Sequence, residues 1–267
     1  MEDKNQPLIE NYETKRMSDM TKRLTPVLTF ALLCGVSMLS SADLKEDVTA
    51  AMASEQRSDA HKARDRNRKP VATLEFFGLT SDMRVLELLP GGGWYTTLLA
   101  PVLENNGKLY VAVGTQNIEN AKAQGAYPSV EVITIGGKFE RKGRFTEIPG
   151  LTIDVDDIDM ALTFRNLHNF TADGRKGMNE AVFKALKAGG IYGVVDHTRR
   201  HMQGDNDENR RRVDPVLMIK EIEAAGFEFV DSSNLHYRPD DELVYEVGRK
   251  TVTGNTDRFT LLFRKPE

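Results

Sequence analysis

Residues 85–95 have the sequence VLELLPGGGWY, from Val85 to Tyr95, and this stretch decides the fold. Its first half is an apolar run typical of a buried strand, and its second half is a glycine-rich turn that leads into an apolar helix. Glycine lets the backbone approach a ligand without a clash from Cβ, and the free N–H groups at the start of a helix favour an anion. The stretch therefore predicts a ligand site at the carboxyl end of a strand in an α/β sheet.

Strand and helix patterns alternate along most of the chain after residue 70. Such alternation predicts a parallel sheet with helices on both faces. The chain closes with two strand patterns and no convincing helix between them, which suits a final strand antiparallel to its neighbours. The expected strands are 84–89, 108–113, 130–135, 159–164, 190–196, 227–230 and 259–263, and the expected helices are 71–77, 94–103, 118–124, 172–187 and 215–226.

The first 42 residues have the pattern of an export signal. Lys22 and Arg23 precede an almost wholly apolar run over 24–39, and Ser40-Ser41-Ala42 provides the small residues of a cleavage site. A membrane anchor is the alternative, but the run is shorter than the roughly 20 residues that a membrane span prefers. We therefore predict a signal peptide over 1–42, export to the periplasm, and no stable membrane span after cleavage.

The remaining residues are enough for one domain with a full core. We expect a heavily charged helix over 43–70 and a main domain over 71–267, and the basic run over 62–69 is typical of a solvated helix face. The net charge of −4 argues against nucleic acid as a partner, because phosphate binding needs a basic surface. The only cysteine, Cys34, lies within the predicted signal, so we expect no disulfide and no thiolate metal site.

The glycine-rich stretch resembles motif I of the class I S-adenosylmethionine-dependent methyltransferases, in which an acidic residue precedes a Gly-x-Gly-x-Gly-like turn. Glu87 takes the place of the acid, and Gly91 and Gly93 match the last two glycines. Leu89 stands where the first glycine usually lies. The resemblance implies a Rossmann-like sheet of seven strands, mostly parallel with an antiparallel last strand, and helices on both faces. It also implies S-adenosylmethionine as the cofactor.

Over about residues 60–267 the chain is similar to a bacterial group of exported proteins known as predicted methyltransferases. Besides the glycine-rich stretch, the similar segments are Phe164-Arg165-Asn166-Leu167-His168-Asn169, Val194-Val195-Asp196-His197 and Thr256-Asp257-Arg258-Phe259. The cofactor contacts that we expect from the resemblance and from the strand ends are Glu87, Gly91, Gly92, Gly93, Trp94, Asn117 and Asn166.

The glycine loop has two other interpretations. A dinucleotide site would need the pattern Gly-x-Gly-x-x-Gly, which fails because Thr96 stands at the third glycine position. A tight turn without a ligand is the second alternative. The chain also departs from the methyltransferase pattern at the end of the second strand, where those enzymes place an acidic residue that holds the ribose. Asn117 or Gln116 would have to take this role, more weakly than a carboxylate.

His168, Asp196 and His197 are the candidate catalytic residues. They follow the fourth and fifth strands, at the same edge of the sheet as the glycine loop. Imidazole exchanges protons near neutral pH, so His168 is a candidate general base, and Asp196 would orient one of the two histidines. The alternatives are a histidine hydrogen-bonded within a loop and a solvated strand end.

Two further features near these residues have competing interpretations. His197 and His201 are four residues apart, a spacing that suits metal ligands on a helix, but the charged residues over 205–212 favour a loop. No His-Glu-x-x-His pattern is present, so we expect no metal site. Trp94 and Tyr95 follow the glycine loop, where they would either cover an acceptor or pack in the core.

These patterns favour methyl transfer from S-adenosylmethionine to an unidentified small or medium acceptor. The main alternative is a non-catalytic ligand-binding protein on the same fold, because export would carry the chain away from a cytosolic cofactor. A nicotinamide-dependent oxidoreductase is a further alternative.

We predict that the mature protein begins at Asp43, because the small residues Ser40 and Ala42 occupy the positions that signal cleavage requires. N-terminal sequencing of the protein from its native host measures this start directly. A mature chain that keeps residues 24–39 would contradict cleavage.

Overall fold

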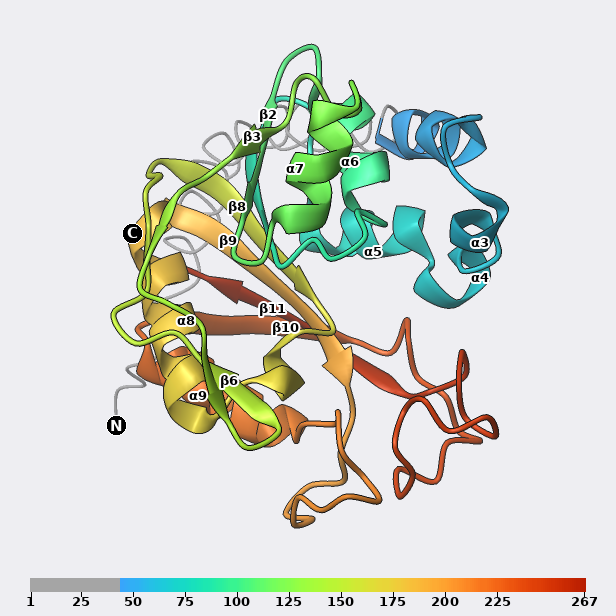
Figure 1. The fold of residues 1–267 in the computed structure, drawn as a ribbon, viewed down its shortest axis with the longest axis vertical. Coiled ribbons are helices and arrows are strands. Elements are labelled where there is room, and N and C mark those ends of the chain that lie inside the picture. Colours follow the sequence, from blue (N-terminus) through green and yellow to red (C-terminus); the bar gives the residue numbers. More distant parts are fainter. Residues whose placement is uncertain (1–43) are drawn as a thin grey trace, which may run out of the picture. The chain divides into compact units, whose positions relative to one another are not determined.

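The computed structural model describes residues 44–267, so the predicted signal peptide over 1–42 lies outside the described residues. A seven-stranded sheet forms the centre of this part of the chain (Figure 1). Its strands, in spatial order, are β10 (Glu228–Ser233), β11 (Arg258–Arg264), β9 (Leu186–His197), β8 (Ile158–Phe164), β1 (Arg84–Leu88), β2 (Lys108–Ala112) and β3 (Glu131–Val132).

The pairings run parallel from β9 through β8, β1 and β2 to β3. The last strand of the chain, β11, lies between β9 and β10 and is antiparallel to both. The predicted Rossmann-like sheet, mostly parallel with an antiparallel last strand, is therefore confirmed. Each of the seven strands overlaps the range expected from the sequence.

The central strands β1, β2 and β8 are mostly apolar and buried on both faces. Successive residues of a strand point to opposite faces, so each of these strands contributes to two separate cores. In β1, for example, Val85 packs in one apolar cluster and Leu86 in the other. In β8, Met160 and Ala161 divide in the same way. A strand whose apolar residues follow one another without alternation is therefore buried on both sides, and helices must cover both faces of the sheet.

Two groups of helices cover the two faces (Figure 1). The first group is α8 (Ala172–Ala185) and α9 (Pro215–Ala224), which bury Met178 and Ile222 in one core. The second group packs on the other core and consists of α5 (Pro70–Phe77), α6 (Thr96–Leu103), α7 (Gln116–Ala123) and the helical residues 44–53. Side chains cap the N-termini of both helices of the first group. Thr171 accepts a hydrogen bond from the backbone N–H of Gly174, and Asp214 accepts one from that of Val216.

The single helix expected over 43–70 is wrong. The chain is helical over 44–53 and then forms two short helices, α3 (Asp59–Lys62) and α4 (Asp65–Arg68). Arg57 folds the segment back on itself, because its guanidinium donates to the carbonyl of Met52 and forms a bidentate pair with Asp65. Lys69 ends α4 with a left-handed backbone at φ 41°, directly before Pro70 begins the next helix.

The interpretation of the basic run over 62–69 as a solvated face is wrong for Arg68, whose residue is only 5% exposed. Its guanidinium lies 4.2 Å from the centroid of the Trp94 ring, and that indole covers its apolar face. A charge pattern does not distinguish an arginine stacked on an aromatic ring from one in water, and this is why the sequence misplaced it.

The strand expected over 130–135 is shorter than predicted, since only Glu131 and Val132 pair with β2. The chain then forms two small antiparallel sheets. One pairs β4 (Ile135–Gly136) with β7 (Thr152–Ile153), and the other pairs β5 (Glu140–Lys142) with β6 (Phe145–Glu147). Strands of two or three residues leave no period in the sequence, so the pattern could not reveal them.

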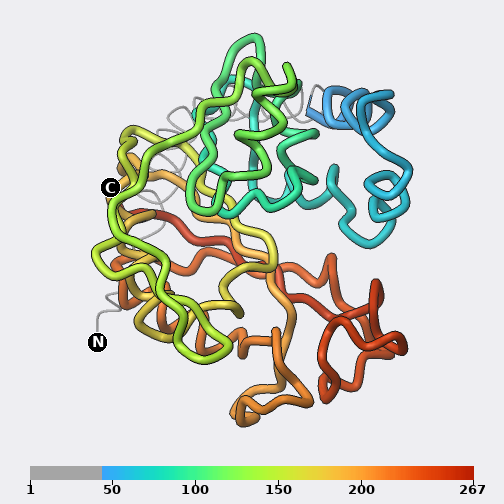
Figure 2. Tube along the Cα trace, viewed as in Figure 1, coloured from blue at the N-terminus to red at the C-terminus, as the bar shows by residue number. Residues whose placement is uncertain are grey.

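Segments far apart in sequence meet beside the sheet edge. The short helix α4 lies next to the irregular connection between β10 and β11 (Figure 2). Asn67 joins them twice, because its side-chain amide donates to the carbonyl of Gly254 and its own carbonyl accepts from the guanidinium of Arg258.

Among residues 44–267, no helix has the length and apolar character that a membrane crossing needs.

His236 ties the same two segments together from the buried side. Its Nε2 lies 3.0 Å from the carbonyl oxygen of Arg68, and its Nδ1 lies 2.7 Å from the hydroxyl of Thr260. A neutral ring satisfies both contacts by donating from Nε2 and accepting at Nδ1. Burial lowers the pKa of His236 to about 4, so the folded protein holds this ring neutral.

Acid should therefore weaken the fold through His236. The pKa of this ring is 6.5 in the unfolded chain and about 4 in the folded one. The stability that the neutral ring contributes is fully present above pH 6.5 and is lost as the pH falls toward 4. Between pH 7.5 and pH 5 the loss should be about 2 kcal/mol of unfolding free energy, measured by urea titration.

The variant His236→Gln keeps a donor and an acceptor but cannot titrate. Its unfolding free energy should fall less between the two pH values than that of the wild type, by the same amount of about 2 kcal/mol. An unchanged pH dependence in the variant would show that His236 is not the group responsible.

Candidate active site

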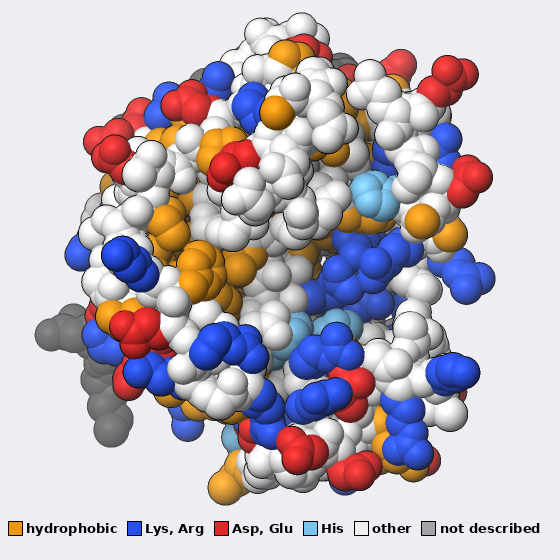
Figure 3. Space-filling model, in the orientation of Figure 1, with side chains coloured by type: hydrophobic (Ala, Val, Ile, Leu, Met, Phe, Trp, Pro, Cys, Tyr) orange, Lys and Arg blue, Asp and Glu red, His pale blue; other side chains and the backbone are white. Residues whose placement is uncertain are grey.

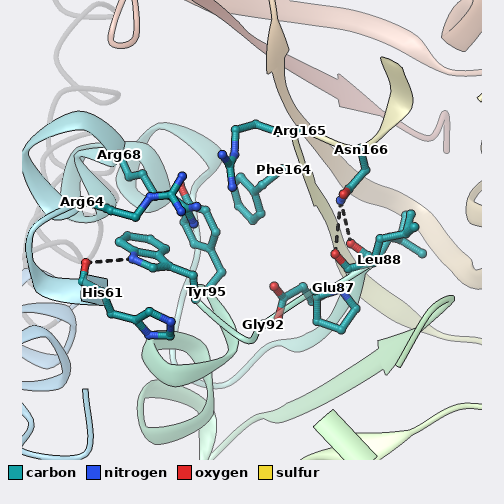
Figure 4. Close-up of a pocket in the computed structure, with 14 residues that line it drawn as sticks. His61, Arg64, Arg68, Glu87, Leu88, Gly92, Tyr95, Phe164, Arg165 and Asn166 are labelled. Carbon is teal, nitrogen blue, oxygen red and sulfur yellow. Dashed lines mark hydrogen bonds between the residues drawn. The ribbon is translucent and has the colours of Figure 1, made fainter. Parts of the chain in front are cut away.

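Parallel pairing brings the carboxyl ends of β1, β8 and β9 to one edge of the sheet. A cavity of about 200 Å³ lies at this edge, above the glycine loop (Figure 4). Three parts of the chain line it: the segment before α5, the loop after β1, and the end of β8. The lining residues are His61, Arg64, Arg68, Glu87, Leu88, Leu89, Pro90, Gly91, Gly92, Trp94, Tyr95, Phe164, Arg165 and Asn166.

Three strands of this edge end in a non-glycine residue with left-handed backbone. Leu89 follows β1 with φ 50°, Val113 follows β2 with φ 64°, and Arg165 follows β8 with φ 65°. Such a conformation costs on the order of 1 to 3 kcal/mol and clusters at functional sites. Leu89 thus adopts a left-handed backbone, a conformation that glycine adopts without strain.

The three glycines of the loop have different surroundings. Gly91 and Gly92 line the cavity, and a Cβ added to Gly92 would meet no atom within 4 Å. Gly93 is outside the cavity lining. A Cβ there would lie 3.0 Å from Ile118 Cδ1 and 3.2 Å from the hydroxyl of Tyr127. Gly91 and Gly92 are therefore placed to contact a ligand, whereas Gly93 lets the loop pack against α7.

Glu87 is the acid of the cavity, and its residue is only 2% exposed. Burial raises the pKa of this carboxyl to about 7, and the hydrogen bond from Thr96 and the charge of Arg68 oppose that rise. The hydroxyl of Thr96 donates to Oε2 at 2.7 Å. In its ionised form this carboxyl is suited to accept a hydrogen bond from a positively charged ligand group.

Two asparagines hold the glycine loop. The amide nitrogen of Asn166 lies 3.2 Å from the carbonyl oxygen of Leu88 and 3.3 Å from that of Leu89 (Figure 4). The amide of Asn117 donates to the carbonyl of Gly91 at 3.2 Å. Asn166 also lines the cavity, whereas Asn117 does not. Asn117, which we predicted to contact the cofactor, therefore supports the glycine loop from outside the cavity.

Trp94 and Tyr95 pack in the core and line the cavity with part of their rings. Trp94 is 5% exposed, and its indole N–H donates to the carbonyl of His61 at 3.0 Å. Tyr95 stacks on Phe164, with ring centroids 3.5 Å apart and an interplanar angle of 11°. Of the two interpretations of this aromatic pair, the structure favours core packing over a cover for the acceptor.

His168 and Asp196 form a buried pair. Asp196 Oδ1 lies 2.5 Å from His168 Nδ1, and Oδ2 accepts from the backbone N–H of His168 at 3.1 Å. The carboxylate thus holds the ring with Nδ1 as the donor and leaves Nε2 for a ligand. His168 lines a second hollow with Arg141, Arg144, Phe145, Asn169, Arg210 and Arg211. His168 does not line the glycine cavity, so the structure places its ring in a separate hollow.

His197 has a different role from His168. Asp196 accepts from the backbone N–H of His197, and the ring instead bonds through Nδ1 to the hydroxyl of Thr256 at 2.9 Å. Burial lowers the pKa of His197 well below its usual value, and the charges of His168 and Arg258 act in the same direction. The ring of His197 is therefore neutral and lines neither hollow.

The histidines at positions 197 and 201 do not converge. His201 bonds through Nδ1 to Asp214 at 2.8 Å, whereas the ring of His197 bonds to Thr256. Within residues 44–267, no group of three or more His, Cys, Asp or Glu side chains is arranged to hold a metal ion.

Sequence reasoning missed the arginines of the cavity. Arg64 and Arg68 come from the N-terminal segment, and Arg165 comes from the end of β8 (Figure 4). In Figure 3, Lys and Arg side chains gather along the hollow at the centre of this face, with histidines beside them. Arg165 carried the only usable signal, because it directly follows a predicted strand at the ligand edge.

Comparison with known proteins supports the fold. No family model and no curated protein matches the sequence. Among solved structures, the chain is similar to an S-adenosylmethionine-dependent methyltransferase from Aquifex aeolicus, at 17% identity and a TM-score of 0.51, over 76% of this chain and 92% of that chain. At this identity the likeness shows that the fold is the Rossmann-like methyltransferase fold.

Two further solved structures are also similar. One is an S-adenosylmethionine-dependent methyltransferase from Clostridium acetobutylicum, at 15% identity and a TM-score of 0.46, over 76% of this chain and 92% of that chain. The other is an S-adenosylmethionine-dependent methyltransferase from Mesorhizobium loti, at 15% identity and a TM-score of 0.47, over 73% of this chain and 97% of that chain.

Proposed function

We propose that this protein transfers a methyl group from S-adenosylmethionine to an unidentified small or medium acceptor. The observation that carries the proposal is the cavity at the carboxyl end of β1, where Gly91 and Gly92 leave open space beside the buried acid Glu87. This cavity lies at the strand edge where open α/β sheets bind their ligands.

The cavity residues fit this cofactor. Gly91 and Gly92 let the backbone approach it, and Asn166 fixes the carbonyls of the loop. Glu87 is suited to the positively charged amino group of the methionine part. S-adenosylmethionine supplies a methyl group that its sulfonium has already activated. The chain therefore mainly has to align the acceptor and exclude water.

His168 is the proposed general base for an acceptor that must lose a proton, and Asp196 is its positioning residue. Asp196 holds Nδ1, so that Nε2 takes the proton as the acceptor forms its bond to the methyl carbon. The electron pair of the broken sulfur–carbon bond stays on sulfur, and the products are S-adenosylhomocysteine, the methylated acceptor and a protonated imidazole.

Ligand binding without methyl transfer is a second candidate function. It is favoured by the end of β2, where Val113, Gly114 and Thr115 provide no acid for the ribose. The next acid, Glu119, accepts from the hydroxyl of Thr115 at 2.5 Å. Binding of NAD or NADP is a third candidate, and it is disfavoured because Thr96 stands where the dinucleotide pattern needs glycine.

A thermal-shift panel separates these functions, because a ligand that binds only the folded state raises the melting temperature. We expect S-adenosylhomocysteine at a hundred times its dissociation constant to raise the melting temperature of the wild type by about 5 °C or more, and NAD and NADP to have no effect. The variant Gly92→Val should abolish the shift, since its side chain fills the open space of the cavity.

Gly177→Val is the matched control, because Gly177 lies in α8 and a Cβ there also meets no atom within 4 Å. It should keep the shift. A wild type that gives no shift with S-adenosylmethionine or S-adenosylhomocysteine would overturn the proposed methyl transfer.

Removal of the general base should affect turnover and spare the cofactor. His168→Ala should lower turnover about a hundredfold, the usual scale for such a loss, and change S-adenosylhomocysteine affinity by less than about threefold. His197→Ala should have a smaller effect, because the ring of His197 bonds to Thr256 and lines neither hollow. The assay needs an acceptor found by screening with radiolabelled cofactor.

The exposed His201 is the control for that series, because it pairs with Asp214 away from both hollows. His201→Ala should keep full turnover. Equal turnover in the wild type and His168→Ala would remove His168 from the mechanism.

We also propose that the protein is exported to the periplasm and processed after Ala42. The pattern Lys22-Arg23, the apolar run over 24–39 and the small residues at 40–42 support this proposal.

A further inference from the structure

Four arginines surround the glycine cavity, and none of them is paired with a carboxylate. Arg64, Arg68 and Arg165 line the cavity, and Arg258 stands close enough to lower the pKa of Arg68 through its charge. Within residues 44–267, each of the four lacks an ion pair. Arg64 is exposed and Arg165 is partly buried, whereas Arg68 and Arg258 are buried. The buried arginines Arg57, Arg175 and Arg212 are each paired with a carboxylate, so Arg68 and Arg258 depart from that pattern.

Contacts hold the side chains of Arg68 and Arg258 in place, and a backbone hydrogen bond fixes the main chain of Arg165. The guanidinium of Arg68 lies 4.2 Å from the centroid of the Trp94 ring and 5.7 Å from that of the Tyr95 ring. Arg165 has a left-handed backbone that is fixed by its N–H bond to the carbonyl of Val195 at 2.7 Å. Arg258 donates to the carbonyl of Asn67, while its buried Nε has no partner. The guanidinium groups of Arg68 and Arg258 therefore present N–H groups with little conformational entropy left to lose.

Burial without a carboxylate partner disfavours the charged forms of Arg68 and Arg258, and the like charge of Arg165 adds to this effect. Burial, followed by the charge of Arg165, lowers the pKa of Arg68 to about 8 and that of Arg258 to about 10. Glu87 is the acid of the cavity, and its own pKa of about 7 leaves it only partly ionised at neutral pH. One such carboxyl does not balance four guanidinium groups. A bound anion would compensate these charges.

We propose that Arg64, Arg68 and Arg165 bind a phosphate-type oxyanion, with Arg258 adding positive charge beside them. Guanidinium groups bind a phosphate through bidentate hydrogen bonds. A dianion compensates several positive charges better than a single carboxylate does. In Figure 4 the guanidinium groups of Arg64, Arg68 and Arg165 lie toward one another across the cavity from Glu87.

We assign the oxyanion to the methyl acceptor. This assignment rests on the proposed function, whereas the oxyanion site itself does not. S-adenosylmethionine carries only one carboxylate and is positively charged overall, so it leaves the arginines uncompensated. The basic surface continues to His168, because Arg141 and Arg210 line the second hollow without a carboxylate partner among the described residues. The acceptor is therefore a phosphorylated molecule whose nucleophile lies toward His168.

Inorganic phosphate is the probe for the oxyanion site. Calorimetric titration of the wild type with phosphate, at constant ionic strength set with sodium chloride, should give saturable binding. Arg165→Gln and Arg68→Gln should each weaken it about tenfold or more, because each removes charge-assisted hydrogen bonds. The phosphate affinity of Arg165→Lys should lie between those of the wild type and Arg165→Gln, since lysine keeps the charge and loses the bidentate geometry.

Arg264→Gln is the matched control, because Arg264 is half exposed at the end of β11 and pairs with Glu228. It should bind phosphate as the wild type does. Absence of saturable phosphate binding to the wild type, or equal weakening in Arg264→Gln and Arg165→Gln, would overturn the site.

Titration with S-adenosylhomocysteine, with and without saturating phosphate, separates this proposal from the proposed function. We expect the two ligands to bind together, with the affinity for S-adenosylhomocysteine changed by less than about threefold. Competition between them would assign the arginines to the cofactor and overturn the acceptor step. Phosphate binding without any S-adenosylhomocysteine binding would keep the oxyanion site and reject methyl transfer.

Discussion

Parallel pairing of β1 with β8, and of β8 with β9, is the constraint on which the rest of this structure depends. Parallel strands end at the same edge, so the loop after β1, the segment after β8 and the end of β9 have to meet there. Asp196 can reach His168 only because their strands are neighbours in this order. The same pairing buries both faces of the sheet and requires helices on each side. Fold and site therefore have a common origin in one pattern of hydrogen bonds.

The sheet edge stores backbone strain, and the surrounding structure holds it. Leu89, Val113 and Arg165 all adopt positive φ directly after a strand, although none is glycine. The hydrogen bond from the N–H of Leu89 to the carbonyl of Ala112 at 3.0 Å secures one of these turns, and the amide of Asn166 donates to carbonyls of the same turn. Strain of this size persists only where neighbouring contacts over-determine the conformation. A rigid loop is useful here, because a preformed cavity loses little entropy when a ligand binds.

Charge at this edge comes from parts of the chain that are distant in sequence. Arg68 belongs to the N-terminal segment, Arg165 to the sheet, and Arg258 to the last strand. They come together because the N-terminal segment packs against the connection between β10 and β11, where the neutral ring of His236 accepts a bond from Thr260 and donates to the backbone of Arg68. The arginine cluster is thus a property of the packing between three segments. The proposed oxyanion would compensate the charge of Arg68 and Arg258, which are buried without a carboxylate partner.

The sequence by itself determined the seven strands of the main sheet, the helices α5 to α9, the glycine loop after β1 and the edge at which His168 and Asp196 lie. These features follow from local patterns, namely apolar runs, glycine turns and helix starts, and each pattern is contained within a dozen residues. Only the tertiary structure decided that Gly93 packs against α7, that Asp196 bonds the ring of His168 and not that of His197, and that Arg68 is buried. These outcomes depend on which distant side chains meet, such as Trp94 covering the guanidinium of Arg68. A charged run has the same sequence pattern in water and over an aromatic ring, so its role is fixed by long-range packing.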